Sequence, residues 1–212
     1  MADATDSLIQ SLGEVSAIAI LRGCPPEHVV GVAQATADAG FGVIEVTFDS
    51  PGAIQSVELL AGLFPGLAIG AGTVRSPEEV GWAAQAGASF VVSPIVDERI
   101  IDACRTHGIA ALPGAATPTE VFQALQAGAG AVKLFPAVQL GGPDYVAAIR
   151  EPLGNPRLVP TGGISAENGR AFLDAGAVAL GVGGSVFARD TMAGGDIGQV
   201  GSRAAAFVRS IT

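Results

Sequence analysis

Glycines that follow helix-like segments recur along this chain at intervals of 20 to 26 residues. Several share the same local text, as in Asp38-Ala39-Gly40 and Gln126-Ala127-Gly128. A glycine at such a place can adopt the left-handed conformation that closes a helix before the chain enters the next strand. A period of this length predicts a repeated helix-and-strand unit. The seven glycines of this series are Gly40, Gly66, Gly87, Gly108, Gly128, Gly154 and Gly176.

Short apolar runs follow these glycines, and one precedes the first. Helix starts lie between them: Ser76-Pro77-Glu78-Glu79 and Thr117-Pro118-Thr119-Glu120 each place an N-cap before a proline. Strands that alternate with helices predict an α/β fold, a (β/α)8 TIM barrel forming a single domain over residues 1–212, with a short helix before the first strand. A doubly wound open sheet is the alternative, and the absence of a nucleotide-binding loop favours the barrel. The eight predicted strands are Ala17–Arg22, Val43–Phe48, Ala68–Thr73, Phe90–Pro94, Ala110–Gly114, Ala131–Pro136, Arg157–Thr161 and Ala179–Gly183.

The apolar content raises the question of a membrane segment. Apolar residues make up 49% of the chain and charged residues 15%, which suits strands buried on both faces. The longest uncharged stretch, from Leu59 to Val74, contains Pro65 and several glycines and is too short to span a bilayer. The N-terminal segment Met1–Asp6 is acidic, where a secretion signal would be basic. We therefore expect a cytoplasmic protein that does not enter membranes.

Charge and residue usage exclude several other classes. A net charge of −9 without a basic run disfavours nucleic acid as a partner. The two cysteines and two histidines are scattered, so we expect no disulfide framework, no metal site and no cofactor. The expected partner is an anionic small molecule, and its binding site must be positive locally rather than through the overall field.

One residue stands apart from all other basic side chains. Ten arginines accompany a single lysine, Lys133, within the apolar segment Ala131–Phe135. Alternation along a strand places Lys133 and Phe135 on one face, so that the amine points into the barrel if Val132 and Leu134 pack against helices. Burial favours the neutral amine, which arginine cannot provide and which can attack a carbonyl carbon. We therefore predict that Lys133 forms an imine, in preference to a buried or rim lysine that is merely paired with a carboxylate.

Imine chemistry also needs a group that moves protons. Glu45 has apolar flanks like those of Lys133 and would share the barrel interior with it as a general acid/base. A plain Glu45–Lys133 ion pair is the alternative. Thr47 and Thr73 would position a carboxylate or a water molecule. Arg22, at the end of the first strand, could bind a carboxylate or could form a salt bridge at the rim.

Two glycine pairs predict a site for a phosphate group. The segment Thr161-Gly162-Gly163 follows the seventh strand, and Gly184-Ser185 follows the eighth. Barrels frequently bind phosphate with the loops after these two strands, because glycine lets the backbone amides approach an anion closely. A phosphorylated substrate is therefore expected.

In order along the chain, these segments resemble the 2-keto-3-deoxy-6-phosphogluconate (KDPG) aldolase family of class I aldolases. The resemblance implies a metal-independent barrel, commonly a homotrimer, that reversibly cleaves KDPG to pyruvate and glyceraldehyde 3-phosphate. It also implies that Lys133 is the imine lysine, Glu45 the acid/base, Thr73 a pyruvyl contact, and that Pro94 and Phe135 are pocket walls. Thr161, Gly162, Gly163, Gly184 and Ser185 match the phosphate-binding positions. The motifs are Ile20-Leu21-Arg22, Glu45-Val46-Thr47, Gly70-Ala71-Gly72-Thr73-Val74, Val92-Ser93-Pro94, Pro113-Gly114, Lys133-Leu134-Phe135-Pro136, Pro160-Thr161-Gly162-Gly163-Ile164 and Gly183-Gly184-Ser185.

One departure from the family pattern concerns the substrate. Some members have an arginine four residues after the catalytic glutamate, where this chain has Asp49, and Arg22 is the available substitute. The 6-phosphogalactonate epimer or 4-hydroxy-2-oxoglutarate (KHG) is therefore an alternative substrate. More distant alternatives are a phosphosugar isomerase or epimerase, which would not need Lys133 as a nucleophile, and a non-catalytic phosphosugar-binding barrel.

Overall fold

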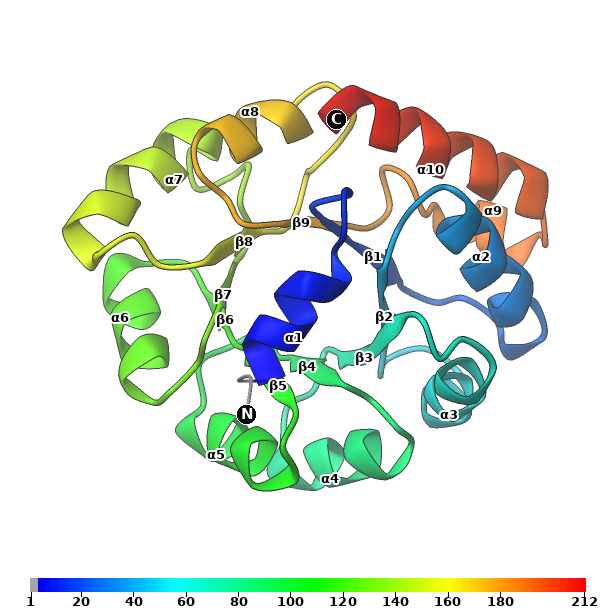
Figure 1. Ribbon diagram of the computed structural model, residues 1–212, viewed down its shortest axis with the longest axis horizontal. Coiled ribbons are helices and arrows are strands. Elements are labelled where there is room, and N and C mark those ends of the chain that lie inside the picture. Colours follow the sequence, from blue (N-terminus) through cyan, green and yellow to red (C-terminus); the bar gives the residue numbers. More distant parts are fainter. Residues whose placement is uncertain (1–3) are drawn as a thin grey trace.

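Short parallel strands line the centre of the molecule and helices surround them (Figure 1), in a computed structural model that describes residues 4–212. Residues 1–3, which belong to the acidic segment behind the cytoplasmic expectation, lie outside this range. Among the helices of residues 4–212, none combines the length and apolar character needed to cross a bilayer. The strands are β1 (Ala17–Leu21), β2 (Val43–Thr47), β3 (Ala68–Gly72), β4 (Phe90–Val92), β5 (Ala110–Leu112), β6 (Gly114–Ala115), β7 (Val132–Leu134), β8 (Leu158–Pro160) and β9 (Leu180–Val182).

The strands close into a barrel, which confirms the predicted fold. One sheet has the order β5-β4-β3-β2-β1-β9 and the other the order β6-β7-β8. The second sheet joins β9 through a parallel bridge between Thr161 and Gly181 and through a bond from Val178 N–H to Leu158 O of 3.0 Å. The predicted fifth strand is divided into β5 and β6 at Pro113, because proline has no N–H for the ladder. Each predicted strand thus contains an observed strand, and most observed strands end before the predicted last residue.

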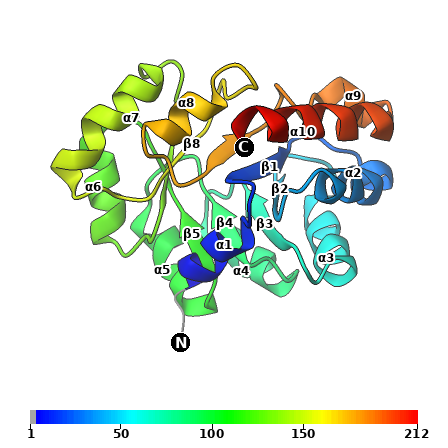
Figure 2. The same ribbon diagram turned by 45° about the horizontal axis from the view of Figure 1, so that its top comes forward.

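Helices form the outer layer of the barrel. Figures 1 and 2 show α10 beside α2 and α9, which closes the ring next to β1. Both predicted N-caps are confirmed: Ser76 accepts from the N–H of Glu79, and Thr117 and Glu120 form a capping box. The helices are α1 (Ala4–Ser11), α2 (Pro26–Asp38), α3 (Ala53–Leu63), α4 (Pro77–Gln85), α5 (Glu98–His107), α6 (Pro118–Gln126), α7 (Gly142–Arg150), the 3-10 turn η1 (Glu151–Leu153), α8 (Gly169–Asp174), α9 (Arg189–Ala193) and α10 (Ile197–Ile211).

The glycine series ends helices as predicted at six of its seven positions, where the glycine has a positive φ. Gly108, for example, follows α5 with φ 69° and donates to the carbonyl of Arg105 over 3.1 Å. Gly66 is the exception. It lies in a turn in which Leu67 N–H donates to Phe64 O over 3.0 Å, and Pro65 takes the second position of that turn.

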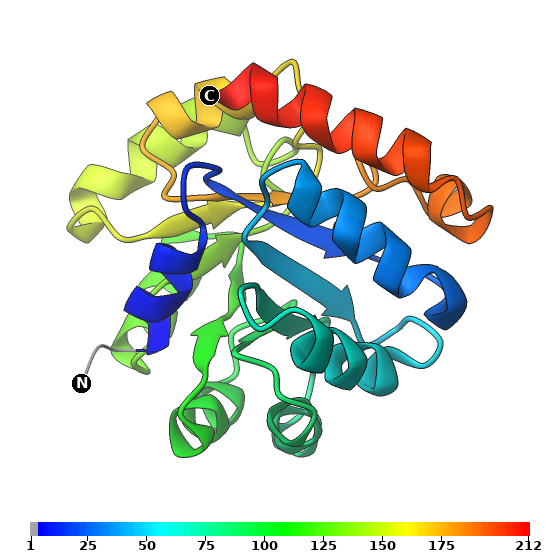
Figure 3. The ribbon, with the colours of Figure 1, turned by 45° about the vertical axis from the view of Figure 1, so that its right-hand side comes forward.

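Helix α1 closes the end of the barrel at which the strands begin. In Figure 3 the arrows of β1 and β2 run away from the end where α1 lies. Leu8 of α1 and Leu12 pack onto the apolar side chains that fill this end of the lumen, including those of Val43 and Phe90. A second apolar layer, between strands and helices, contains Val132, Leu134 and the phenylalanines of the outer shell. The opposite end, where the strands finish, is therefore the end left for a site.

Candidate active site

A cavity of about 640 Å³ opens at the carboxyl ends of the strands. Ten of the twelve predicted site residues line it, and the two others are Glu45 and Thr47. Side chains from six of the strand ends meet there, as expected for the functional face of a barrel. The ten residues are Arg22, Thr73, Pro94, Lys133, Phe135, Thr161, Gly162, Gly163, Gly184 and Ser185.

Lys133 points from the middle of β7 into the barrel. Its flanks Val132 and Leu134 are fully buried in the outer apolar layer, so the predicted alternation is confirmed. The lysine is only 8% exposed, and its Nζ lies 5.2 Å from the centroid of the Phe135 ring. The amine therefore ends at the floor of the cavity, within reach of a bound molecule but largely shielded from bulk water.

Glu45 lies deeper in the same lumen, on β2. It is 2% exposed, and its Oε1 has no hydrogen-bond partner among residues 4–212. Burial raises the pKa of this carboxyl group above its usual range, against the smaller opposing effects of Lys133 and Arg22. No ion pair joins Glu45 to Lys133 within the described chain, so the plain ion-pair alternative is not what the structure contains.

Gly72 at the end of β3 gives Glu45 its space. A Cβ atom on Gly72 would lie 1.8 Å from Oε1 of Glu45, which no side chain can tolerate. The next residue, Thr73, adopts φ 60°, a left-handed conformation that is strained for a β-branched residue. This part of the glycine-rich β3 motif therefore accommodates the carboxyl group and turns Thr73 towards the cavity.

Arg22 forms the salt bridge that was one of its two predicted roles. Its guanidinium pairs with Asp49 and donates from Nη2 to Oγ1 of Thr73 over 3.0 Å. Partial burial would raise the pKa of Asp49, but a hydrogen bond from Thr47 and the nearby Arg22 charge lower it below its usual value. Arg22 also lines the cavity, so the ion pair holds a cation at its wall.

Thr47, which was predicted to position a carboxylate or a water molecule, is not among the residues that line the cavity. It is fully buried, and its hydroxyl shares a hydrogen bond of 3.0 Å with that of Ser50. The chain turns directly after β2, where Ser50 N–H donates to Thr47 O, and this turn covers the side chain. Thr47 therefore helps to hold the carboxylate of Asp49, which in turn pairs with Arg22.

The two glycine pairs meet at one wall of the cavity. Gly162 and Gly163 have φ of 95° and 77°, and a Cβ on Gly163 would lie 2.7 Å from Val138. The Asn168 side chain fixes their loop by donating to the carbonyl of Gly163 over 2.9 Å. Within residues 4–212, the backbone N–H groups of Gly163, Gly184 and Ser185 have no acceptor. These donors can bind an anion, as the sequence predicted for this wall.

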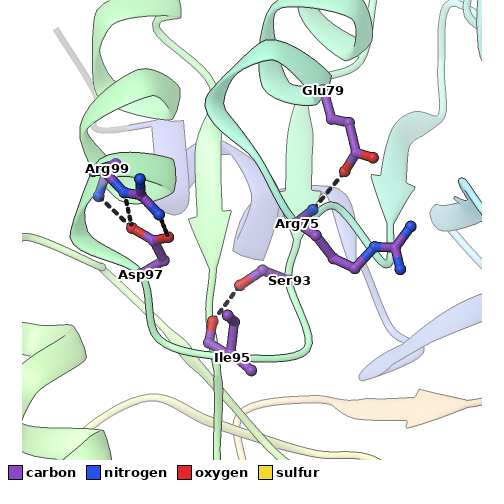
Figure 4. A network of polar contacts seen from close by, with 6 residues as sticks. All are labelled: Arg75, Glu79, Ser93, Ile95, Asp97 and Arg99. Atoms are coloured by element: carbon purple, nitrogen blue, oxygen red, sulfur yellow. Dashed lines mark hydrogen bonds and ion pairs between the residues drawn. The ribbon is translucent and has the colours of Figure 1, made fainter.

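Short local bonds hold the loops on the other side of the mouth (Figure 4). Arg75 N–H donates to the carboxylate of Glu79, and the Ser93 hydroxyl donates to the carbonyl of Ile95. Arg99 and Asp97 form an ion pair at the start of α5. Pro94, between Ser93 and Ile95, is thereby kept against the cavity.

Sequence reasoning missed one charged residue of the cavity, Arg189. It begins α9, four residues after Ser185, and it lines the cavity together with Lys133 and Arg22. Among residues 4–212, the lining contains three basic side chains and no acidic one, although the whole chain carries a net charge of −9. The site is therefore locally positive, and the position of Arg189 just after the second glycine pair was the signal that could have identified it.

The motifs of this site are those of a known family. The sequence model described as KDPG and KHG aldolase matches residues 8–202. This chain belongs to the KDPG and KHG aldolase family. The family match confirms the resemblance that the sequence motifs indicated, and it covers the barrel and all the predicted site residues.

Individual relatives of the family agree over most of their length. The chain is 36% identical over 195 residues to 2-dehydro-3-deoxy-6-phosphogalactonate aldolase of Escherichia coli (strain K12), covering 91% of this chain and 93% of that protein. It is 35% identical to 2-dehydro-3-deoxy-phosphogluconate aldolase of Treponema pallidum (strain Nichols), covering 92% of each. A structure of KDPG aldolase from Legionella pneumophila, with pyruvate captured as a covalent carbinolamine intermediate, has a TM-score of 0.84 and 27% identity over 93% of this chain and 96% of that one.

Proposed function

We propose that this member of the family is a Schiff-base aldolase that reversibly cleaves KDPG to pyruvate and glyceraldehyde 3-phosphate. The observation that carries the proposal is the single lysine, 8% exposed, in a lumen shared with the buried Glu45, whose Oε1 has no hydrogen-bond partner within residues 4–212. A neutral amine is a nucleophile for a ketone carbon, and a carboxyl group of raised pKa can both accept and donate a proton near neutral pH. The pyruvate carbinolamine named for the Legionella pneumophila aldolase supports the same chemistry here.

The proposed cleavage uses these two groups in turn. Lys133 Nζ attacks C2 of the keto acid, and the carbinolamine loses water to form an imine. Glu45 accepts the proton of the C4 hydroxyl group, and the C3–C4 bond breaks. The bond electrons pass into an enamine while glyceraldehyde 3-phosphate leaves. Glu45 then returns its proton to C3, and water hydrolyses the pyruvyl imine to release pyruvate and the free amine.

The remaining residues of the cavity are proposed to bind the substrate. Arg22 and Thr73 would hold the carboxylate of the keto acid, because a guanidinium with a nearby hydroxyl suits a planar anion. Pro94 and Phe135 would form apolar walls around the pyruvyl methylene. The glycine wall of Thr161, Gly162, Gly163, Gly184 and Ser185 would bind the phosphate through backbone N–H donors.

The 6-phosphogalactonate epimer of KDPG is a second candidate substrate. Two observations favour it: the 36% identity to the Escherichia coli 2-dehydro-3-deoxy-6-phosphogalactonate aldolase, and the presence of Asp49 with Arg22 in place of an arginine at position 49. KHG, which lacks a phosphate group, would leave the glycine wall unused.

Cleavage kinetics on KDPG, its galactonate epimer and KHG, followed by the pyruvate released, test the proposal. We expect cleavage of at least one phosphorylated epimer, with kcat/KM above that for KHG. Preference for the galactonate epimer would select the second candidate. Absence of pyruvate from all three, together with interconversion of phosphosugars by the same protein, would establish the isomerase alternative instead.

We also propose that the protein assembles as a homotrimer. Large apolar side chains on the helices are half-exposed, namely Leu63 of α3, Trp82 of α4 and Phe122 of α6. Such side chains on an enzyme surface favour burial against another subunit. Light scattering after size exclusion should give about three times the 21.0 kDa of one chain, and a monomer mass at micromolar concentration would refute the trimer.

A further inference from the structure

Arg189 lies where the loop after β9 meets the open end of the cavity. It is the first residue of α9, it is exposed, and it follows Gly184 and Ser185 on the same segment. All three residues line the cavity that Lys133 enters from below. The side chain is thus placed on the glycine wall rather than on the outer surface of the barrel.

Gly23 shows in which direction the guanidinium extends. A Cβ atom on Gly23 would lie 2.4 Å from Nε and 2.9 Å from Nη2 of Arg189. Gly23 directly follows Arg22, beyond the end of β1, which is the neighbour of β9 in the barrel. The guanidinium therefore lies across the mouth between the ends of two adjacent strands, in space that a side chain at position 23 would occupy.

The charge of Arg189 has no counter-charge among the described residues 4–212. Arg22, the other arginine of the cavity, is paired with Asp49. Arg189 has no ion pair or hydrogen bond to any residue in the range 4–212. It stands beside the N–H groups of Gly184 and Ser185, which also lack acceptors within that range. One guanidinium and two backbone N–H groups without an acceptor among residues 4–212 thus line the same cavity.

We propose that Arg189 binds the phosphate group of the substrate and makes the enzyme selective for phosphorylated aldehydes. This inference rests on the proposed aldolase function and adds a residue to its phosphate site. A guanidinium can donate two parallel N–H bonds to a phosphate dianion and also neutralises part of its charge. The glycine amides can add hydrogen bonds, but they are neutral and cannot balance that charge. Lys133 and Arg22 would still bind the keto acid end of the substrate. Loss of Arg189 should therefore affect only the phosphate end.

The test is aldol addition of pyruvate to D-glyceraldehyde 3-phosphate and, in parallel, to unphosphorylated D-glyceraldehyde. In Arg189→Gln, kcat/KM for the phosphorylated aldehyde should fall about 10- to 100-fold, the range for lost hydrogen bonds to a charged group. The value for D-glyceraldehyde should stay within about twofold, since that substrate has no group for Arg189 to bind. Arg189→Lys keeps the positive charge but cannot donate two parallel N–H bonds. Its kcat/KM for the phosphorylated aldehyde should therefore lie between those of the wild type and of Arg189→Gln.

Two further measurements separate binding from a general effect of charge. Inorganic phosphate should inhibit the wild-type enzyme competitively, and its inhibition constant should rise in Arg189→Gln. Arg203→Gln removes an exposed charge from α10, remote from the cavity lining, and should change neither quantity. If Arg189→Gln left the ratio of kcat/KM for the two aldehydes unchanged, the proposed role of Arg189 would be overturned, but the aldolase function would not. Absence of any addition by the wild-type protein would instead overturn the aldolase function.

Discussion

The two ends of the barrel differ in chemistry although the same strands build both. At the end where the strands begin, α1 covers a lumen filled by apolar side chains such as Val43, Phe90 and Ala131. Two residues further along the same faces, Val43 gives way to Glu45 and Ala131 to Lys133. The closed end excludes water beneath the ionisable pair, and the open end admits an anion. Burial thus raises the pKa of the Glu45 carboxyl group and shields the Lys133 amine, 8% exposed, from bulk water.

The largest expected effect comes from removing the amine at the open end. Lys133→Met keeps the length of the side chain but cannot form an imine, so kcat for cleavage should fall about 10⁵-fold or more, as when a covalent nucleophile is lost. Steady-state pyruvate release measures it, and Lys133→Arg serves as the control that keeps the charge. Activity in either variant above about one hundredth of the wild-type value would show that the lysine is not the nucleophile.

Removing the proton-transfer group should cost less. Glu45→Gln keeps the shape of the side chain, and kcat should fall about 10²- to 10⁴-fold, the usual contribution of a general acid/base. The imine itself can still form slowly in this variant, so borohydride should still trap pyruvate on Lys133. A variant with normal turnover would remove Glu45 from the mechanism.

The closed end should affect stability and not chemistry. Leu8→Ala opens a void beneath the barrel and should lower the free energy of unfolding by about 2–5 kcal/mol. The kcat per folded molecule should be unchanged, since Leu8 lies at the far end of the lumen. Leu59→Ala on α3, where the residue is 44% exposed, is the matched control and should cost less than about 1 kcal/mol. Denaturant unfolding distinguishes these outcomes, and a large loss of kcat in Leu8→Ala would mean that the two ends are not independent.

The same buried carboxyl group should make wild-type stability depend on pH. Because the folded-state pKa of Glu45 is raised, the folded protein holds this proton more tightly than the unfolded chain does. The stability that the bound proton contributes is fully present below the unfolded pKa and is lost as pH rises through the folded pKa. Relative to wild type, the stability of Glu45→Gln should therefore increase as pH rises from 4.5 to 7. A gain that instead grew at low pH would contradict the raised pKa.

The smallest effect concerns the carboxylate contact at the rim. Arg22→Gln should raise the KM for pyruvate in the addition direction about tenfold, a loss typical of one charge-assisted hydrogen bond. The effect should be modest because Arg22 is about half exposed and already shares its charge with Asp49. An unchanged KM would leave Arg22 with its salt bridge alone.

The repeated helix-and-strand unit, with the absence of a nucleotide-binding loop, favoured the barrel over an open sheet, and strand alternation predicted the direction of Lys133 and Glu45. Alternation is a property of the backbone, so the inward face could be read from the apolar neighbours Val132 and Leu134. For Thr47 the same alternation does not take account of the turn after β2, which covers its side chain, so its role at the substrate stays a prediction. Arg189 was missed because it reaches the site through a long side chain lying on Gly23, a contact between segments far apart in the sequence. Periodicity therefore predicts where backbone directs a side chain, and not where a flexible side chain ends.

Trapping of the pyruvate adduct tests the central claim most directly. Protein incubated with pyruvate and borohydride should gain the mass of one reduced pyruvyl group, located by peptide mapping on Lys133. The chain has one lysine, so peptide mapping has to distinguish Lys133 from the N-terminal amine alone. Lys133→Met should gain no mass under the same conditions. Absence of the adduct from wild-type protein, or an adduct confined to the N-terminus, would contradict the account.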